Sequence, residues 1–238
     1  MIVPIVAPSG AIVNIADGGV REMPRKYELR QRAERQAETR RRIIEATVAL
    51  HQELGVARTT ISDIAARSGV ERATVYRHFE DEYSLIEACT SHYFAQHPFP
   101  DPGRWSDIAD PAERLRVALT EVYAYHRATE PMVDQALRSL PELPVLQEVL
   151  APTWAIWRDI AATLLPPGYG SELDRTQLNA AVGHALSYFT WRSLVREQGL
   201  NDRDAATLLV GMILSVPQSD SCEEADGKCH PRETRVAT

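Results

Sequence analysis

Long apolar runs are absent from this sequence of 238 residues. No stretch reaches the roughly 18 consecutive apolar residues that a membrane-spanning helix requires, so we expect no membrane partner. The chain has three cysteines, 12 glycines and 15 prolines. So little cysteine excludes a disulfide framework and predicts a reduced, cytoplasmic protein. Glycine and proline gather in loops and at the ends, which leaves long segments free to form helices.

The signatures of common enzyme classes are also missing. We find no phosphate-binding loop, no dinucleotide-binding glycine pattern, no nucleophile elbow and no His/Glu pair with metal-ligand spacing. Cys222, Cys229 and His230 could offer metal ligands, but they lie in a polar, acidic tail without a fourth ligand. The sequence therefore predicts a protein that is not an enzyme and binds no metal or cofactor.

The first 20 residues are apolar but make a poor signal peptide. No positive charge precedes the apolar run, and Pro4 and Pro8 interrupt it. Two interpretations remain open: a disordered extension, or a translation start at Met23 rather than Met1. Neither changes the predicted function.

The net charge of −7 hides a strong asymmetry. Residues 21–42 hold nine Lys and Arg against four Glu, and the body from residue 81 onward is acidic. Such a basic segment favours contact with a polyanion, although a solvated charged helix would show the same composition.

Apolar spacing predicts an all-α fold, with neither a sustained alternating pattern nor an internal repeat. In the first helix, Ile43, Thr47, Leu50 and Leu54 form one apolar stripe, which Gly55 ends. The expected helices are about 38–54, 61–68, 72–78, a fourth from 81, then 111–129, 132–139, 145–165, 172–198 and 202–216.

Residues 59–79 carry the motif that indicates function. Two short helices joined through Gly69 fit a helix-turn-helix, with Thr60 and Asp63 as a capping box for the first. Val75 and Phe79 would bury the inner face of the second helix. Its outer face shows groups suited to base edges and phosphates, without a carboxylate from Arg72 to His78. Such a helix fits a DNA major groove.

This segment resembles the DNA-binding domain of the TetR (tetracycline repressor) family. That family shows Thr-x-x-x-Asp-Ile-Ala, a Gly-Val turn and Thr-x-Tyr-x-x-Phe, and the match covers about residues 38–90. The stretch YFTWRSLVREQGLNDRDAATLLVGMI also resembles the last two helices of the family. The resemblance implies domains at 1–37 (disordered extension ending in a basic arm), 38–84 (DNA-binding), 85–217 (larger helical ligand-binding and dimerisation domain) and 218–238 (disordered tail).

The resemblance also implies residue roles. Thr74 and Arg72 would face bases, and Ala73 would allow close approach. Phosphates would be held by Tyr76, His78 and Thr60. The full expected DNA-binding set is Arg40, Arg41, Thr60, Arg72, Ala73, Thr74, Tyr76, Arg77 and His78.

Some positions depart from the family pattern. Glu71 replaces a common Ser, Ala73 a common Gly, and Glu82, flanked by Glu80 and Asp81, a common Lys. The acids at 80–82 should repel a duplex, and we expect the arm at 21–42 to compensate.

The body supplies further expectations. Aromatic groups with polar tips could line an effector pocket or simply form core: Tyr123, His126, Trp154, Trp157, His184, Tyr188 and Trp191. The last two helices would pair with a second copy, or pack within the chain, through small and apolar residues: Gly183, Ala185, Leu186, Phe189, Leu208 and Met212.

The sequence thus predicts a ligand-responsive regulator. It would bind a near-palindromic operator on double-stranded DNA as a homodimer, act as a repressor, and be released or shifted by an unidentified small-molecule effector. Two rival functions are a helical enzyme or carrier with an incidental helix pair, and an architectural DNA binder indifferent to sequence.

Overall fold

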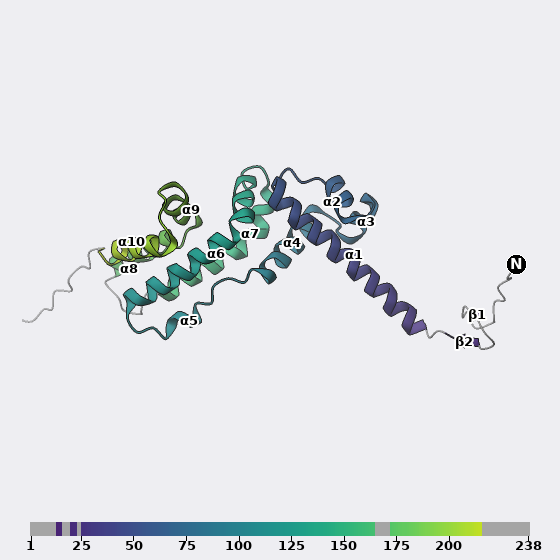
Figure 1. Cartoon of the computed structure of the whole chain (residues 1–238), viewed down its shortest axis with the longest axis horizontal. Helices are drawn as coiled ribbons and strands as arrows, with labels where there is room; N and C mark the ends of the chain where they lie inside the picture. The colour runs from purple at the N-terminus through teal and green to yellow at the C-terminus, as the bar shows by residue number, and fades with distance from the viewer. Residues whose placement is uncertain (1–12, 16–19, 23–24, 165–171, 216–238) are drawn as a thin grey trace, which may run out of the picture. The chain divides into compact units, whose positions relative to one another are not determined.

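The computed structural model describes residues 13–15, 20–22, 25–164 and 172–215. Within these ranges the regular elements are helices, apart from β1 (Val13–Ile15) and β2 (Val20–Glu22), which pair antiparallel. Figure 1 shows the elements along the chain. The predicted all-α fold is confirmed. The two strands were not predicted because three residues are too few to give an alternating pattern. None of the helices in these ranges combines the length and apolar character needed to cross a bilayer.

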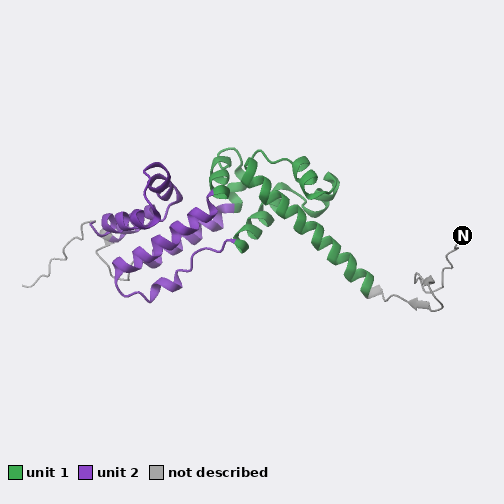
Figure 2. Ribbon diagram, in the orientation of Figure 1, with its two compact units in different colours: residues 1–96, 131–149 green, residues 97–130, 150–238 purple. Residues whose placement is uncertain are grey.

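The helices fall into two compact units, coloured separately in Figure 2. Unit 1 contains residues 1–96 and 131–149, and unit 2 contains residues 97–130 and 150–238. Two long helices, α6 (Pro111–Ser139) and α7 (Pro144–Leu164), contribute residues to both units. The domain boundaries expected from the sequence stay predictions.

Unit 1 begins with α1 (Arg25–Leu54) and continues through α2 (Ile61–Ser68), α3 (Arg72–His78) and α4 (Glu82–Gln96). Its core joins the second half of α1 to the other three helices through Ile43, Ile64, Val75 and Leu85. The first half of α1 extends beyond this core (Figure 1). Helix α1 therefore starts at Arg25 rather than near Glu38, because residues without a buried face gave no apolar stripe to detect.

Local chemistry sets both ends of α2 as the sequence predicts. The Thr60 hydroxyl accepts from the Asp63 N–H at 3.2 Å, and the Asp63 carboxylate accepts from the Thr60 N–H at 3.2 Å. Gly69 ends the helix at φ 68°, a left-handed conformation that costs other residues roughly 1–2 kcal/mol. The Val70 N–H then bonds to the Ala65 carbonyl at 3.0 Å and closes the turn.

From α6 onward, the helices depart from the prediction at two places. The first is Pro131, where we expected a break and α6 continues to Ser139. A proline inside a helix costs about 3 kcal/mol. Thr129 before the proline and Ser139 after it are both buried, and the Ser139 hydroxyl accepts from the Ala57 N–H at 3.3 Å, so α6 is packed on both sides of Pro131.

The second departure lies after α8 (Glu172–Ala185). One helix was predicted over 172–198, whereas the chain turns at Ser187, whose hydroxyl caps α9 (Tyr188–Arg192) by accepting from the Phe189 N–H at 3.2 Å. A π-helical segment, η1 (Ser193–Glu197), follows, and Gly199 at φ 76° separates it from α10 (Asp202–Leu214). The short α5 (Gly103–Ser106) lies between α4 and α6.

Candidate nucleic-acid interface

Helix α3 presents the outward surface that the sequence predicts. Arg72, Ala73, Tyr76 and Arg77 are exposed, and Thr74 and His78 are half-buried. Val75 is buried against α1, α2 and α4 in the core of unit 1. No carboxylate lies on the outward face of α3, so guanidinium, hydroxyl, phenol and imidazole groups are neighbours on a helix of about two turns.

Phe79 and Arg40 anchor the end of α3 to α1. The Phe79 ring is 3% exposed, and the Arg40 guanidinium carbon lies 4.8 Å from its centroid. This cation–π contact is worth about 0.5–1 kcal/mol at an exposed site. It brings the predicted DNA-binding residue Arg40 to the same edge as α3.

Two other predicted contacts already have partners within the chain. Arg41 forms ion pairs with Glu38 at 2.7 Å and Glu45 at 2.6 Å on α1. The Thr60 hydroxyl donates to the Asp63 carboxylate at 2.6 Å. A phosphate would have to replace these partners, so the DNA-binding roles of Arg41 and Thr60 stay predictions with a competing local explanation.

One of the acidic residues beside α3, Asp81, has a structural role. The Asp81 carboxylate accepts from the Ser84 N–H at 2.8 Å at the start of α4, and this bond lowers the pKa of Asp81. Glu71, Glu80 and Glu82 are exposed. These residues place negative charge beside α3, and the compensation expected from the sequence would require a positive surface nearby.

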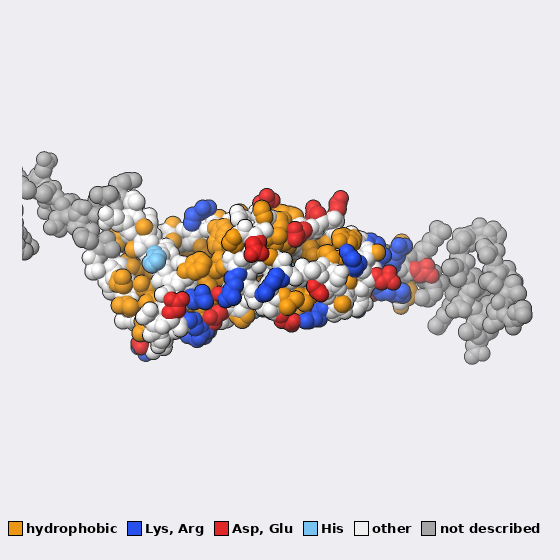
Figure 3. All heavy atoms as spheres, turned by 90° about the horizontal axis from the view of Figure 1, so that it is seen from above, with side chains coloured by type: hydrophobic (Ala, Val, Ile, Leu, Met, Phe, Trp, Pro, Cys, Tyr) orange, Lys and Arg blue, Asp and Glu red, His pale blue; other side chains and the backbone are white. Residues whose placement is uncertain are grey.

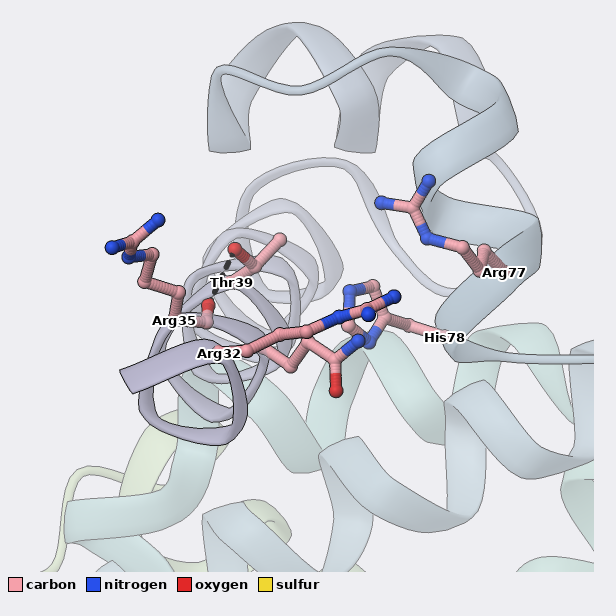
Figure 4. A pocket seen from close by; sticks show the side chains of 6 residues that line it. Arg32, Arg35, Thr39, Arg77 and His78 are labelled. Carbon is pink, nitrogen blue, oxygen red and sulfur yellow. Dashed lines mark hydrogen bonds between the residues drawn. The ribbon is translucent and has the colours of Figure 1, made fainter. Parts of the chain in front are cut away.

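Such a surface lies between α1 and α3. An open hollow of about 370 Å³ is lined by four residues of α1 and two of α3, namely Arg32, Arg35, Gln36, Thr39, Arg77 and His78. Figure 4 shows Arg32 extending from α1 in the direction of His78 and Arg77 extending from α3, while the Arg35 guanidinium is directed away from α3. The hollow belongs entirely to unit 1.

The charge around the hollow acts on His78. The pKa of its imidazole is lowered, first because partial burial disfavours the charged ring, and then because the Arg77 and Arg40 guanidinium groups are near. An anion placed among these groups would oppose the same effect and favour protonation.

Sequence reasoning placed the α1 residues of this hollow in a basic arm but did not single them out. Residues 32, 35, 36 and 39 repeat at helical spacing and so share one face. That spacing was the available signal, but it becomes meaningful only when α1 is known to extend back to Arg25.

The predicted effector residues of unit 2 divide into two groups. His126 lies within ring contact of Trp157 at 5.4 Å, Tyr188 at 5.7 Å and Trp191 at 5.9 Å between centroids. Tyr123 joins them at 6.4 Å from His126. Trp154 and His184 are exposed and take no part in these contacts.

Several polar atoms of the rings in this aromatic cluster already have hydrogen-bond partners within the chain. The Tyr123 hydroxyl donates to the Ala185 carbonyl at 2.9 Å, and the His126 Nε2 lies 2.9 Å from the Leu186 carbonyl. The Trp191 indole N–H donates to Asp202 at 3.0 Å. The core interpretation therefore has direct support for these residues, and ligand contact stays a prediction.

The predicted dimer residues lie on α8, α9 and α10. Phe189, Leu208 and Met212 are exposed by 61%, 45% and 58%, and a Cβ added at Gly183 would meet nothing within 4 Å. Leu186 and Ala185 are instead buried within the chain. Figure 3 shows hydrophobic side chains reaching the surface in the part of the molecule that carries these helices.

Cysteine and metal chemistry add nothing to this interface. Burial raises the pKa of Cys89 to about 12, so its thiol stays protonated. Cys222, Cys229 and His230 lie outside the described residues. Among the described side chains, no group of three or more His, Cys, Asp or Glu is placed to hold a metal ion.

Residues 43–89 match the family described as bacterial regulatory proteins, tetR family. A curated relative, the HTH-type transcriptional regulator TtgR of Pseudomonas putida, is 32% identical over 116 residues, which are 48% of this chain and 53% of the relative. The chain thus matches about half the length of this relative.

Solved structures extend the likeness to most of the fold. A TetR-family transcriptional regulator from Mesorhizobium loti has a TM-score of 0.57 at 18% identity, over 78% of this chain and 99% of that one. AibR, solved with isovaleryl coenzyme A and operator DNA, has a TM-score of 0.52 at 22% identity, over 73% and 97% of the two chains. At these identities the likeness concerns the fold.

Proposed function

Because residues 43–89 match the tetR family of bacterial regulatory proteins and the fold resembles a solved TetR-family structure, we propose that this chain belongs to that family and is a sequence-specific, DNA-binding transcriptional regulator that acts as a repressor. The observation that carries the proposal is the outward face of α3, which offers Arg72, Thr74 and Tyr76 without an interrupting carboxylate. Arginine and threonine bond to base edges in the major groove, and tyrosine bonds to phosphate.

We propose further that two copies bind a near-palindromic operator. Each copy carries a single α3, and a dimer places two such helices on successive major grooves. The exposed apolar side chains of Phe189, Leu208 and Met212, together with the open surface at Gly183, support a pairing face on α8, α9 and α10. Leu186 takes no part, since its own chain covers it.

A small-molecule effector would then act through unit 2. AibR was solved with both isovaleryl coenzyme A and operator DNA, which motivates the same arrangement here. The aromatic cluster around His126 is the proposed site, with Trp157 as the ligand-facing candidate because it is half-buried, whereas Tyr188 is buried. The operator would be released or held according to which conformation the effector favours.

Selection of bound duplexes from random DNA tests the proposal. A regulator of this kind enriches one motif with two-fold symmetry. Retention of duplexes without enrichment would favour an architectural binder, and failure to retain any duplex at low salt would refute DNA binding altogether.

A further inference from the structure

The hollow between α1 and α3 gathers positive groups that the chain itself does not neutralise. Among the described side chains, Arg32, Arg35 and Arg77 form no ion pair; Arg35 bonds only to the Gln31 amide oxygen at 3.3 Å and Arg77 only to the Thr74 hydroxyl at 3.4 Å. Elsewhere on α1, Arg30 pairs with Glu34 at 2.9 Å and Arg41 with Glu38.

The arginines of α1 with an ion pair and those without one lie on different faces of the helix. Residues 32, 35 and 39 follow one another at spacings of three and four and line the hollow. Residues 30 and 34 are neighbours at a spacing of four, and a step of two residues turns about 200° around the helix, so they lie on the far side. The hollow thus has cations without carboxylates, and the opposite face has both.

Helix polarity explains part of the arrangement. Arg77 and His78 occupy the last turn of α3, where a positive charge is favourable. That effect fades within one turn and gives no reason for Arg32 to approach from another helix. Like charges brought together without a counterion repel, so an anion in the hollow would relieve this repulsion.

We propose that the hollow holds one phosphate group of the DNA backbone, with Arg32 donating from α1 and Arg77 and His78 donating from α3. Guanidinium groups present paired N–H donors that match phosphate oxygens. This assignment rests on the proposed function, because it requires α3 to enter the major groove, whose edges are lined by phosphates. The hollow is open and adjoins the outward face of α3, which favours the DNA backbone over a free phosphate ion.

The phosphate contact would also offset the repulsion between DNA and the acidic residues at the start of α4. Glu80 and Glu82 are exposed beyond the end of α3. A phosphate held from the α1 side would lie among positive groups, and the extended first half of α1 would supply the charge that the segment after α3 lacks.

The test compares Arg32→Ala with Arg30→Ala in the full chain. Both variants remove one positive charge from an exposed position of α1, so they share any long-range electrostatic effect. Affinity for a selected duplex and an unrelated duplex is measured over a range of NaCl concentrations. Arg32→Ala should lower the slope of log affinity against log salt by about 0.9 for each bound protomer and weaken both duplexes by about tenfold. Arg30→Ala should change affinity by less than about twofold.

A second variant tests the geometry of the donor. Arg32→Lys keeps the charge but removes the paired N–H donors, so it should retain the salt slope and lose about threefold in affinity. Phosphorus NMR of inorganic phosphate, mixed with protein in the absence of DNA, tests the alternative occupant.

The outcomes separate this inference from the proposed function. If the wild type bound no duplex, the proposed function would fail, and this inference with it. If the wild type bound but the Arg32→Ala and Arg30→Ala variants had the same salt slope, only the phosphate assignment would fail. Broadening of the inorganic phosphate signal that depends on Arg32, with an unchanged salt slope, would assign the hollow to a free anion and overturn the proposal.

Discussion

Thr74 and Tyr76 are two residues apart on α3 and have different surroundings. Thr74 is half-buried, and its hydroxyl accepts from Arg77 at 3.4 Å. Tyr76 is 52% exposed. The predicted roles also differ, since Thr74 is expected to contact base edges and Tyr76 the DNA backbone.

Replacing each by alanine should therefore give different results. Tyr76→Ala should weaken binding to every duplex by about tenfold, since one phosphate contact is lost. Thr74→Ala should change preference at one base step of each half-site by about 1 kcal/mol. Binding to a library of single-base operator variants distinguishes the two effects. An identical profile for both variants would show that these contacts are assigned wrongly.

Two buried histidines, His51 in unit 1 and His126 in unit 2, make folding sensitive to acid. Burial lowers the pKa of each imidazole to about 4, below the value of about 6.5 for an exposed ring. Above pH 6.5 both rings are neutral in the folded and unfolded states. Between pH 6.5 and 4 only the unfolded chain gains the protons, so stability falls as pH falls.

We expect the free energy of unfolding to drop by about 2 kcal/mol for each histidine between pH 7 and pH 5. Urea denaturation at a series of pH values measures this drop. A His51→Asn variant cannot gain the proton and should show a smaller loss over the same interval. If its pH dependence matched that of the wild type, His51 would not be the source.

At the scale of elements, α1 combines two functions in one helix. From Ile43 to Leu50 it supplies the core of unit 1, whereas residues 27–42 are exposed or half-buried. The first half can therefore be removed without exposing the core. Its basic face lines the hollow beside α3, so its contribution should be to binding rather than to folding.

Deletion of residues 1–37 should leave the thermal unfolding of the remaining chain unchanged, because the core begins at Ile43, and should weaken DNA binding by about tenfold or more, because Arg32 and Arg35 are lost. Deletion of residues 1–24 alone leaves the hollow complete and should have a much smaller effect. Fluorescence anisotropy with a labelled duplex measures both. Equal affinity of the two deletion variants would contradict the idea that the arm offsets the acids at 80–82.

The helix pair α2 and α3 is the element most fully specified by nearby residues. Its cap at Thr60 and its left-handed turn at Gly69 involve partners within a few positions along the chain. The α8–α9 turn was missed for a related reason. Ser187 is a good cap, but apolar spacing continues on both sides of it, and a cap signal inside a periodic segment does not by itself interrupt a predicted helix.

For the whole molecule, pairing of two copies decides whether α3 can read a symmetric site. Leu208 and Met212 lie one turn apart on α10 and are both largely exposed. A Cβ added at the neighbouring Gly211 would meet nothing within 4 Å. Because these apolar side chains are exposed and the space at Gly211 is open, this face of α10 is suited to close approach by another helix.

Leu208→Asp combined with Met212→Asp should convert the proposed dimer to monomers. Sedimentation velocity would show the change in mass, and affinity for a two-fold symmetric duplex would fall by about a hundredfold because the two α3 helices are no longer linked. Ile156→Asp serves as the control, since Ile156 is 39% exposed on α7, away from α10 in sequence. Monomeric wild-type protein would refute the dimer directly.

The sequence by itself determined the features that depend on neighbouring residues. The periods of the helices, the capping box at Thr60, the turn at Gly69 and the burial of Val75 and Phe79 could all be predicted, because each is controlled by spacing or by partners a few residues away. The resemblance to the tetR family lies in this same segment.

Tertiary structure decided what depends on distant parts of the chain. Packing carries α6 through Pro131, and folding places His126 among aromatic rings of two later segments. The hollow joins Arg32 to Arg77, 45 positions apart. No local rule relates such residues, because their proximity depends on how α1 and α3 pack on a shared core.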